Sequence, residues 1–163
     1  MRRAEAAVSI DAPIEVVWAV VTDLAAYPSW DPFIATAHGT AAVGEEIILG
    51  VRLTSGRQLT LRAKVGRRVA PTRMGSALTA VLEYDLVGAL ASTNTVRSRR
   101  RHLLRQAADG VTAYRVEEWF RGAVALGVPV AKVQAAFRAH AQALKERAEQ
   151  LHRAERPVPV PAH

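Results

Sequence analysis

The segment that most constrains the fold is the last long helical stretch of the chain, residues 130–154. Its apolar side chains recur at steps of three and four, with charged and amide side chains between them, which predicts an amphipathic helix. The apolar stripe contains Val130, Val133, Phe137, Ala141, Leu144, Ala148 and Leu151. At 1.5 Å per residue this helix would be about 37 Å long, which exceeds the width of a small domain. Only a broad, curved surface such as a twisted sheet can cover the whole stripe.

Length and composition indicate one soluble domain. With 163 residues the chain can build a single core, and we expect one domain over residues 1–155 followed by a proline-rich, disordered tail at 156–163. No run of about 18 uncharged apolar residues occurs, which argues against a transmembrane segment and favours a cytoplasmic protein. Cysteine is absent, so disulfides, thiolate metal sites and thiol nucleophiles are excluded.

Ahead of the long helix, the sequence predicts one strand, two short helices and then six more strands. Strand 5–10 is followed by Asp11 and Pro13, a cap and a first-turn proline for a helix, and residues 23–28 form a second short helix or a turn. The later strands are predicted at 34–38, 45–53, 57–69, 77–86, 95–106 and 111–122. This order predicts an α+β fold in which an antiparallel sheet covers the C-terminal helix.

Alternation along the strands separates an apolar inner face from a polar outer face. Three strands have clearly apolar inner sets, namely Ile47, Leu49, Val51 and Leu53; Leu59, Leu61, Ala63 and Val65; and Leu78, Ala80, Leu82, Tyr84 and Leu86. Strand 95–106 places arginines on the outer face, namely Arg97, Arg99, Arg101 and Arg105. The inner face nevertheless carries one polar cluster, which consists of Tyr84, Ser98, Arg100, His102, Tyr114 and Glu118. A few polar groups in an apolar lining are typical of a ligand pocket.

The turn before the last strand sets which of these polar groups face each other. If residues 108–110 form a three-residue hairpin loop, Arg100 lies directly across from Glu118, whereas a loop of another length would place His102 there. An unpaired inward charge is costly in a dry core. The pair is therefore either mutually compensated or wetted by a cavity, and a purely structural ion pair stays an open alternative.

The order of elements and several motifs resemble a known family. The motifs are Ile10-Asp11-Ala12-Pro13, Thr22-Asp23, the segment from Tyr27 to Phe33, Gly44 before a strand, Asp109-Gly110-Val111-Thr112, the Glu-x-aromatic-x-Gly pattern of Glu118, Phe120 and Gly122, and Phe137 with Leu144-Lys145. Together they resemble the polyketide cyclase/dehydrase and lipid-transport branch of the START-like, SRPBCC superfamily. The chain departs from it at Asp31, where the family often has asparagine, and at Tyr84, where tryptophan is common.

The resemblance implies a helix-grip fold, which is also the fold of the birch pollen allergen. In that fold a curved antiparallel sheet wraps around the C-terminal helix, two short helices follow the first strand, and an apolar cavity lies between sheet and helix. A cavity that binds a small molecule has a volume of about 300 to 1,000 Å³. We therefore expect such a cavity to bind a hydrophobic or aromatic small molecule such as a lipid, a polyketide or a quinone-like compound. The ligand-binding candidates are Tyr84, Ser98, Arg100, His102, Tyr114, Glu118, Phe120, Trp30, Phe33 and Phe137.

The alternative is an enzyme, a polyketide cyclase/dehydratase (aromatase) that needs no cofactor. Its catalytic candidates are Glu118, His102, Arg100 and Tyr114. In an apolar setting Glu118 would act as the base and His102 would shuttle protons. Tyr84 and Tyr114 would donate to a carbonyl oxygen, and Arg100 would hold an enolate or a carboxylate. These side chains serve equally well as the polar anchor of a carrier.

Other site classes are disfavoured. The histidines have no metal-ligand spacing, and no phosphate loop, dinucleotide fingerprint or nucleophile elbow is present, so neither metal nor cofactor is expected. The net charge of +7 would suit an RNA or ribosome contact. Nucleic acid is still the weakest hypothesis, because the arginines of strand 95–106 lack interleaved aromatic residues. We expect a monomer or a homodimer.

Overall fold

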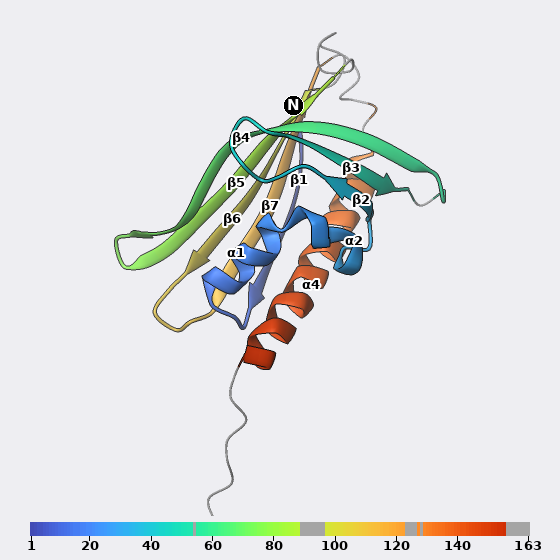
Figure 1. Ribbon diagram of the computed structural model, residues 1–163. Helices are drawn as coiled ribbons and strands as arrows, with labels where there is room; N and C mark the ends of the chain where they lie inside the picture. Colours follow the sequence, from blue (N-terminus) through green and yellow to red (C-terminus); the bar gives the residue numbers. More distant parts are fainter. Residues whose placement is uncertain (54, 89–96, 123–126, 128, 156–163) are drawn as a thin grey trace, which may run out of the picture.

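The sheet is one continuous, curved layer of antiparallel strands (Figure 1). The computed structural model of the protein describes residues 1–53, 55–88, 97–122, 127 and 129–155, so the predicted tail lies outside the described residues. The elements are β1 (Arg2–Ile10), α1 (Ile14–Thr22), η1 (Leu24–Ala26), α2 (Tyr27–Trp30), β2 (Ile34–His38), β3 (Glu46–Arg52), β4 (Gln58–Met74), β5 (Ala77–Val87), β6 (Arg97–Gln106), β7 (Thr112–Arg121) and α4 (Val130–Glu155). The strand order is β1-β7-β6-β5-β4-β3-β2, so β7 leads back to the side of β1.

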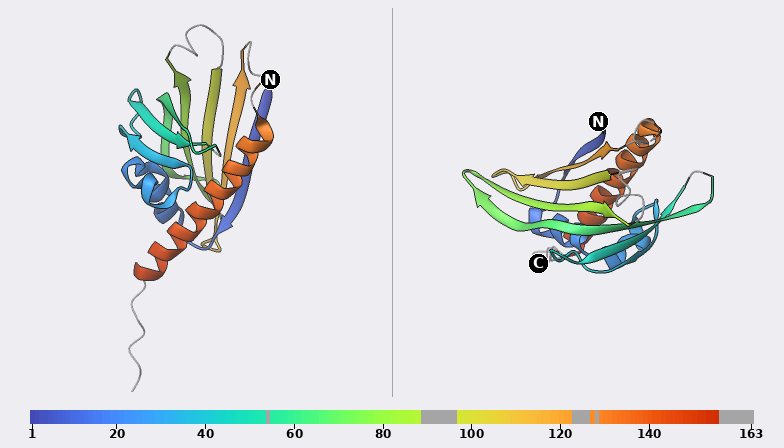
Figure 2. Two further views of the ribbon diagram at one scale, coloured as in Figure 1. Left: turned by 90° about the vertical axis from the view of Figure 1, so that its right-hand side faces the viewer. Right: turned by 90° about the horizontal axis from the view of Figure 1, so that it is seen from above.

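The long helix α4 crosses the concave face of the sheet diagonally (Figure 2). It begins and ends within one residue of the predicted bounds, and it packs most closely on β1 and α1. The side chains that it buries are Phe137, His140, Ala141, Leu144 and Ala148. A curved antiparallel sheet around a C-terminal helix, with short helices after the first strand, confirms the predicted helix-grip fold.

The short helices close one end of the concave face. Helix α1 buries Ile14, Val17, Trp18, Val20 and Val21. The Tyr27 hydroxyl donates a hydrogen bond of 2.7 Å to the carbonyl oxygen of Val21, which ties α2 to α1. This bond fixes the start of the link from α2 to β2, where Asp31 lies.

The pairing of β6 with β7 has the predicted register. Arg100 is the direct cross-strand partner of Glu118, and both are on the inner face. The turn that sets this register contains Gly110 at φ 78°, a left-handed conformation that glycine adopts without strain. The alternative register, with His102 opposite Glu118, is excluded.

Two predictions on the β3–β4–β5 region are wrong. The strand predicted at 57–69 was expected to end at residue 69, but β4 continues to Met74. Pro71 is accommodated because the pairing with β5 is irregular between Val69 and Thr72, where no ladder hydrogen bond is needed from its nitrogen. Leu53 and Leu59 were assigned to the core, yet they are 43% and 44% exposed. They lie at the far end of the β3–β4 hairpin, away from the helices that cover the inner face.

Candidate functional site

The polar side chains of the inner face join into one chain of hydrogen bonds. In order, its members are Arg100, Tyr84, His102, Tyr114, His140 and Asp31. Arg100 Nη1 lies 3.5 Å from the Tyr84 hydroxyl, which is 3.1 Å from His102 Nε2. His102 Nδ1 is 2.6 Å from the Tyr114 hydroxyl, and that hydroxyl is 2.9 Å from His140 Nε2. His140 Nδ1 closes the chain at 2.7 Å from Asp31 Oδ2.

Four elements and one link supply this chain. β5 provides Tyr84, β6 provides Arg100 and His102, and β7 provides Tyr114, all at inward positions of neighbouring strands. Helix α4 presents His140 from the opposite side, and the α2–β2 link presents Asp31. From Tyr84 to Asp31 every member is less than a tenth exposed.

Burial decides the charge of the central groups. It lowers the pKa of His102 well below the ordinary value, and repulsion from His140 and Arg100 adds to the effect, so His102 is neutral near pH 7. Burial also raises the pKa of both Tyr84 and Tyr114, so both hydroxyls keep their protons. The middle of the chain therefore consists of neutral groups that can both donate and accept a hydrogen bond.

The Asp31 end is ionised. Burial acts to raise the pKa of Asp31, but it is outweighed by the hydrogen bond and charge of His140, the bond of 2.9 Å from the Phe33 backbone N–H to Oδ1 and the charge of Arg100 taken together. These bonds hold the pKa of Asp31 below its ordinary value. A carboxylate at this end can only accept a hydrogen bond.

The two ends together fix the direction of the whole chain. The Arg100 guanidinium can only donate and the Asp31 carboxylate can only accept. With one proton on each imidazole, the assignment is then unique: each member donates to the next, from Arg100 through Tyr84, His102, Tyr114 and His140 to Asp31. His102 accordingly carries its proton on Nδ1 and offers Nε2 as an acceptor to Tyr84.

Arg100 also forms an ion pair with Glu118 beside the first member of the chain. Its Nε and Nη2 lie 2.9 and 2.8 Å from Glu118 Oε2, and although burial acts to lower its pKa, the interactions with Glu118 and Tyr84 together raise it. The guanidinium carbon stands 4.9 Å from the centre of the Phe137 ring, a cation–π distance. The Arg100 side chain keeps 20% exposure and that of Glu118 keeps 8%, so the pair lies between the core and the solvent.

The free space at this pair is smaller than predicted. A pocket of about 20 Å³ lies there, lined by Leu49, Leu61, Ala63, Tyr84, Leu86, Ser98, Arg100 and Glu118. The expected 300 to 1,000 Å³ is wrong for this part of the inner face. The side chains of Arg100 and Phe137 pack against each other where the cavity was expected.

The structure brings together most of the predicted site residues. Tyr84, Ser98, Arg100 and Glu118 line the pocket, and His102 and Tyr114 lie behind them in the chain. Phe137 covers Arg100, and Phe120 is buried on β7 across from Ser98.

The two aromatic residues predicted near α2 lie apart from the pocket. Trp30 packs against His140, with ring centres 5.4 Å apart. Its indole N–H is buried and has no hydrogen-bond partner in the part of the chain that the structure describes. Phe33 is half-buried before β2 and contributes its backbone N–H to Asp31.

Sequence reasoning missed two members, Asp31 and His140. His140 is three residues after Phe137 and four before Leu144, so helical spacing alone puts it on the buried stripe of α4. Asp31 gave a weaker signal, because only the fold brings it to within 2.7 Å of a helix more than a hundred residues later. Among the described residues, no three metal-ligating side chains gather at one place. No described helix is both long enough and apolar enough to cross a bilayer.

Several solved structures share this fold. A START superfamily protein from Mycobacterium smegmatis is 20% identical, with a TM-score of 0.67 over 91% of this chain and 98% of that one. The ZhuI aromatase/cyclase from Streptomyces sp. R1128 is 18% identical, with a TM-score of 0.66 over 91% and 94%. A norcoclaurine synthase from Thalictrum flavum is 9% identical, with a TM-score of 0.64 over 92% and 95%. At these identities the likeness shows the fold alone.

Sequence comparison identifies the family. A search of the curated proteins found no match to this chain. The family model described as polyketide cyclase / dehydrase and lipid transport matches residues 1–149, which includes every strand, the short helices and most of α4. The matched span also contains all six members of the hydrogen-bonded chain. This protein therefore belongs to the polyketide cyclase/dehydrase and lipid-transport family.

Proposed function

We propose that the protein binds a hydrophobic or aromatic small molecule with one polar end at the inner face of its sheet. The observation that carries this proposal is the position of Arg100, Glu118 and Tyr84 in a pocket whose other walls include Leu49, Leu61 and Leu86. Apolar walls with a few convergent polar groups are what small-molecule sites have in common. The description of the family, which includes lipid transport, supports a ligand of this kind.

The polar end of the ligand should carry an oxygen. Arg100 offers N–H donors and Glu118 offers an acceptor oxygen, so a phenol, a ketone or a carboxylate can be held there. A polyketide or a quinone-like ring meets this requirement with more contacts than a simple hydrocarbon does. The ligand has to displace Phe137 from the Arg100 guanidinium, because the present pocket of about 20 Å³ holds no organic molecule.

A fluorescence titration tests this proposal. The probe is a panel of hydroxynaphthoquinones and hydroxyanthraquinones, with naphthalene as the ligand that lacks a polar end. We expect saturable binding of the oxygenated compounds, a loss of affinity of about tenfold or more in Arg100→Gln, and little change in Arg105→Gln, whose side chain lies on the outer face. Equal affinity of naphthalene and the quinones, or equal loss in both variants, would remove the basis of the proposal.

Acid–base catalysis is the second candidate, and the direction of the hydrogen-bonded chain favours it. When a substrate gives a proton to the Tyr84 oxygen, Tyr84 can pass its own proton to His102 Nε2. His102 passes its Nδ1 proton to Tyr114, and Tyr114 passes its proton to His140 Nε2. One proton leaves the substrate and one arrives at His140, where the Asp31 carboxylate stabilises the imidazolium.

This path would remove a proton next to a carbonyl while Arg100 stabilises the enolate, which is the first half of an aldol cyclisation. In this proposal Tyr84 and Arg100 are the catalytic residues that meet the substrate. His102, Tyr114, His140 and Asp31 are positioning residues that accept and hold the proton. Glu118, the base predicted from the sequence, holds Arg100 through two contacts to its Oε2, so in this proposal it positions Arg100 and Tyr84 takes the proton from the substrate.

Exchange of deuterium into a 1,3-diketone probe, followed by NMR, separates the enzyme from the carrier. An enzyme should speed exchange, and His140→Gln should slow the catalysed rate by about 10² or more while quinone binding is kept, since glutamine cannot take the proton. A carrier should show no exchange above the buffer rate, which would discard the catalytic candidate and leave the binding proposal intact.

A further inference from the structure

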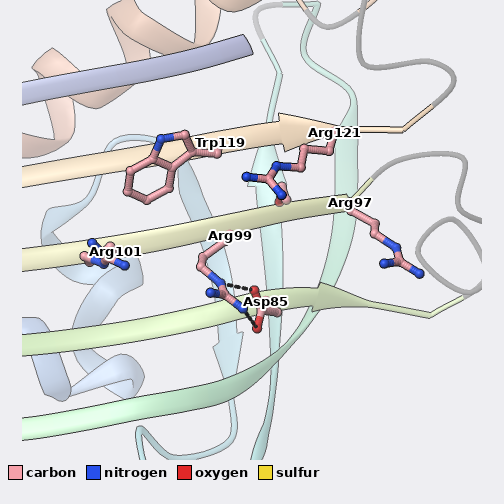
Figure 3. A pocket seen from close by; sticks show the side chains of 7 residues that line it. Asp85, Arg97, Arg99, Arg101, Trp119 and Arg121 are labelled. Atoms are coloured by element: carbon pink, nitrogen blue, oxygen red, sulfur yellow. Dashed lines mark hydrogen bonds and ion pairs between the residues drawn. The ribbon is translucent and has the colours of Figure 1, made fainter. Parts of the chain in front are cut away.

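The outer face of the sheet carries a second pocket, on the side away from α4. Its volume is about 370 Å³, and it lies over β5, β6 and β7. Seven residues line this pocket, namely Asp85, Arg97, Ser98, Arg99, Arg101, Trp119 and Arg121, and Figure 3 labels all of them except Ser98. Four of these seven are arginines, so the question is which of their charges the protein itself compensates.

Two of the four arginines are compensated by ion pairs. Arg99 Nε lies 2.7 Å from Asp85 Oδ1, and Figure 3 shows the two side chains turned toward each other. Arg101 Nε lies 2.7 Å from Glu83 Oε2, and Glu117 adds a weaker contact at 3.6 Å. These carboxylates come from neighbouring strands at matching register positions. The centre of the outer face is therefore close to electrically balanced.

Arg97 and Arg121 are not compensated in this way. They are direct cross-strand partners at the ends of β6 and β7, and both are exposed. Arg121 Nε bonds only the Met1 thioether, at 3.3 Å, and within the described residues neither side chain has a carboxylate at ion-pair distance. Like charges directly opposite each other on a sheet are unfavourable. Figure 3 shows their guanidinium groups turned in different directions along the pocket, so an anion that lessens the repulsion has to reach both.

An aromatic ring lies next to the uncompensated pair. Trp119 precedes Arg121 by two residues, on the same face of β7, and Figure 3 shows its indole beside Arg121. It is only half-buried, and Arg101 and Arg3 contact its ring with guanidinium carbons 5.1 and 5.5 Å from the ring centre. The arginines of β6 lack an aromatic partner in their own strand, but the neighbouring strand supplies one in space.

We propose that this outer pocket binds a nucleotide. Arg97 and Arg121 hold the phosphate groups through paired N–H donors, the geometry for which guanidinium is suited. The base lies toward Trp119, where it replaces one of the two guanidinium groups that now contact the indole. The volume of about 370 Å³ accommodates one nucleotide and not merely one phosphate. This site is separate from the function proposed for the inner face. It is formed by the outward-facing side chains of strands whose inward-facing side chains form the inner site.

Isothermal titration at low ionic strength tests the proposal with three probes: ADP, inorganic diphosphate and adenosine. ADP should bind most tightly, diphosphate more weakly, and adenosine not measurably. The double variant Arg97→Gln/Arg121→Gln should weaken ADP binding at least tenfold, since each arginine supplies charge-assisted hydrogen bonds. The matched control is Arg105→Gln/Arg115→Gln, which removes two exposed arginines from the same face and the same strands. It should bind ADP like the unmodified chain.

A second variant tests whether the nucleotide base contributes to binding, in addition to the phosphate groups. Trp119→Leu should weaken ADP binding several-fold and leave diphosphate binding unchanged, and thermal melting of each variant verifies that it is folded. The proposal fails if no phosphate probe binds, or if both arginine double variants lose affinity equally, which would indicate only a general surface charge. Binding of a single-stranded oligonucleotide without binding of ADP would also overturn it, by assigning the face to a nucleic acid.

Discussion

Strand β6 places Arg99 on the outer face of the sheet and Arg100, the next residue, on the inner face. The two arginines form ion pairs of nearly equal length, but their exposure to solvent differs greatly. Arg99 faces outward, is 52% exposed and pairs with Asp85 at 2.7 Å. Arg100 faces inward, is 20% exposed and pairs with Glu118 at 2.8 Å. Water screens the first pair, whereas the second is partly removed from water. Nearly equal distances therefore correspond to very different consequences when one partner is lost.

The two faces also differ in what surrounds the pair. On the outer face, arginines of β6 form ion pairs with carboxylates of β5, namely Arg99 with Asp85 and Arg101 with Glu83. On the inner face, one ion pair adjoins a line of neutral hydroxyls and imidazoles that ends at Asp31. Surface ion pairs form and break with little consequence for their neighbours. An inner polar network is worth more than the sum of its pairs and is correspondingly sensitive to the loss of a member.

The largest effect is expected from Glu118→Gln. The substitution leaves the Arg100 charge in the interior without its counter-charge, and breaking a buried pair costs about 3 to 5 kcal/mol. Since Arg100 keeps some contact with solvent, we expect a loss near the lower end, about 3 kcal/mol, in urea unfolding. An unchanged midpoint would mean that solvent reaches the inner pair as freely as the outer one.

Acidification should destabilise the inner face next. The pKa of folded His102 is depressed by burial, so between that value and about 6.5 the unfolded chain binds the extra proton and folding must release it. The stabilisation is thus complete above about pH 6.5 and is lost as the pH falls toward the folded pKa. Melting temperatures between pH 7.5 and 5 should show this decline.

Two histidine variants test whether the pH dependence of the melting temperature comes from the buried His102 or from an exposed histidine. His102→Gln removes the buried titrating group, so its melting temperature should be lower throughout but should vary less with pH. His38→Gln removes an exposed histidine on β2 and should leave the slope unchanged. A slope that disappears in His38→Gln and persists in His102→Gln would contradict the assignment.

Features of the fold and the site that depend on residues close together in the sequence could be predicted, whereas those that depend on distant residues could not. Strand alternation placed Tyr84, Arg100, His102, Tyr114 and Glu118 on the inner face, because the period of two is local. Hairpin geometry predicted the pairing of Arg100 with Glu118, since the turn that sets it is a few residues long. The chain of hydrogen bonds required α4 to be placed against the sheet, which no local pattern specifies.

Two of the errors have the same physical origin. Leu53 and Leu59 satisfy the inner-face pattern, but burial depends on how far the covering helices extend over the hairpin. The inner free volume was overestimated because an apolar lining predicts which side chains face inward and not how tightly they interdigitate. Here the Phe137 ring and the Arg100 guanidinium occupy the space together.

Asp31→Asn should have a smaller effect on stability than the loss of Glu118. The amide oxygen still accepts the hydrogen bond from His140 Nδ1, and only the extra strength that the charge gives to that bond is removed, about 1 kcal/mol. Asparagine is also what the family resemblance leads one to expect at this position. If the chain moves protons, deuterium exchange should fall much more than stability does, because a charge on His140 loses its stabilising carboxylate. A parallel fall in both would indicate a purely structural role.

The smallest effect is expected on the outer face, and it is the one that sharpens the comparison of Arg99 with Arg100. A double-mutant cycle of Arg99→Gln with Asp85→Asn should give a coupling of about 0.2 to 1 kcal/mol, because more than 40% of each side chain stays in water. The same cycle on Arg100 and Glu118 should give several times more. Raising the salt from 0.05 to about 1 M shortens the screening length to about 3 Å, which should nearly abolish the outer coupling and leave most of the inner one. If both couplings were equal and equally sensitive to salt, solvent would have to reach Arg100 as readily as Arg99, and a ligand could then enter the inner pocket without displacing Phe137.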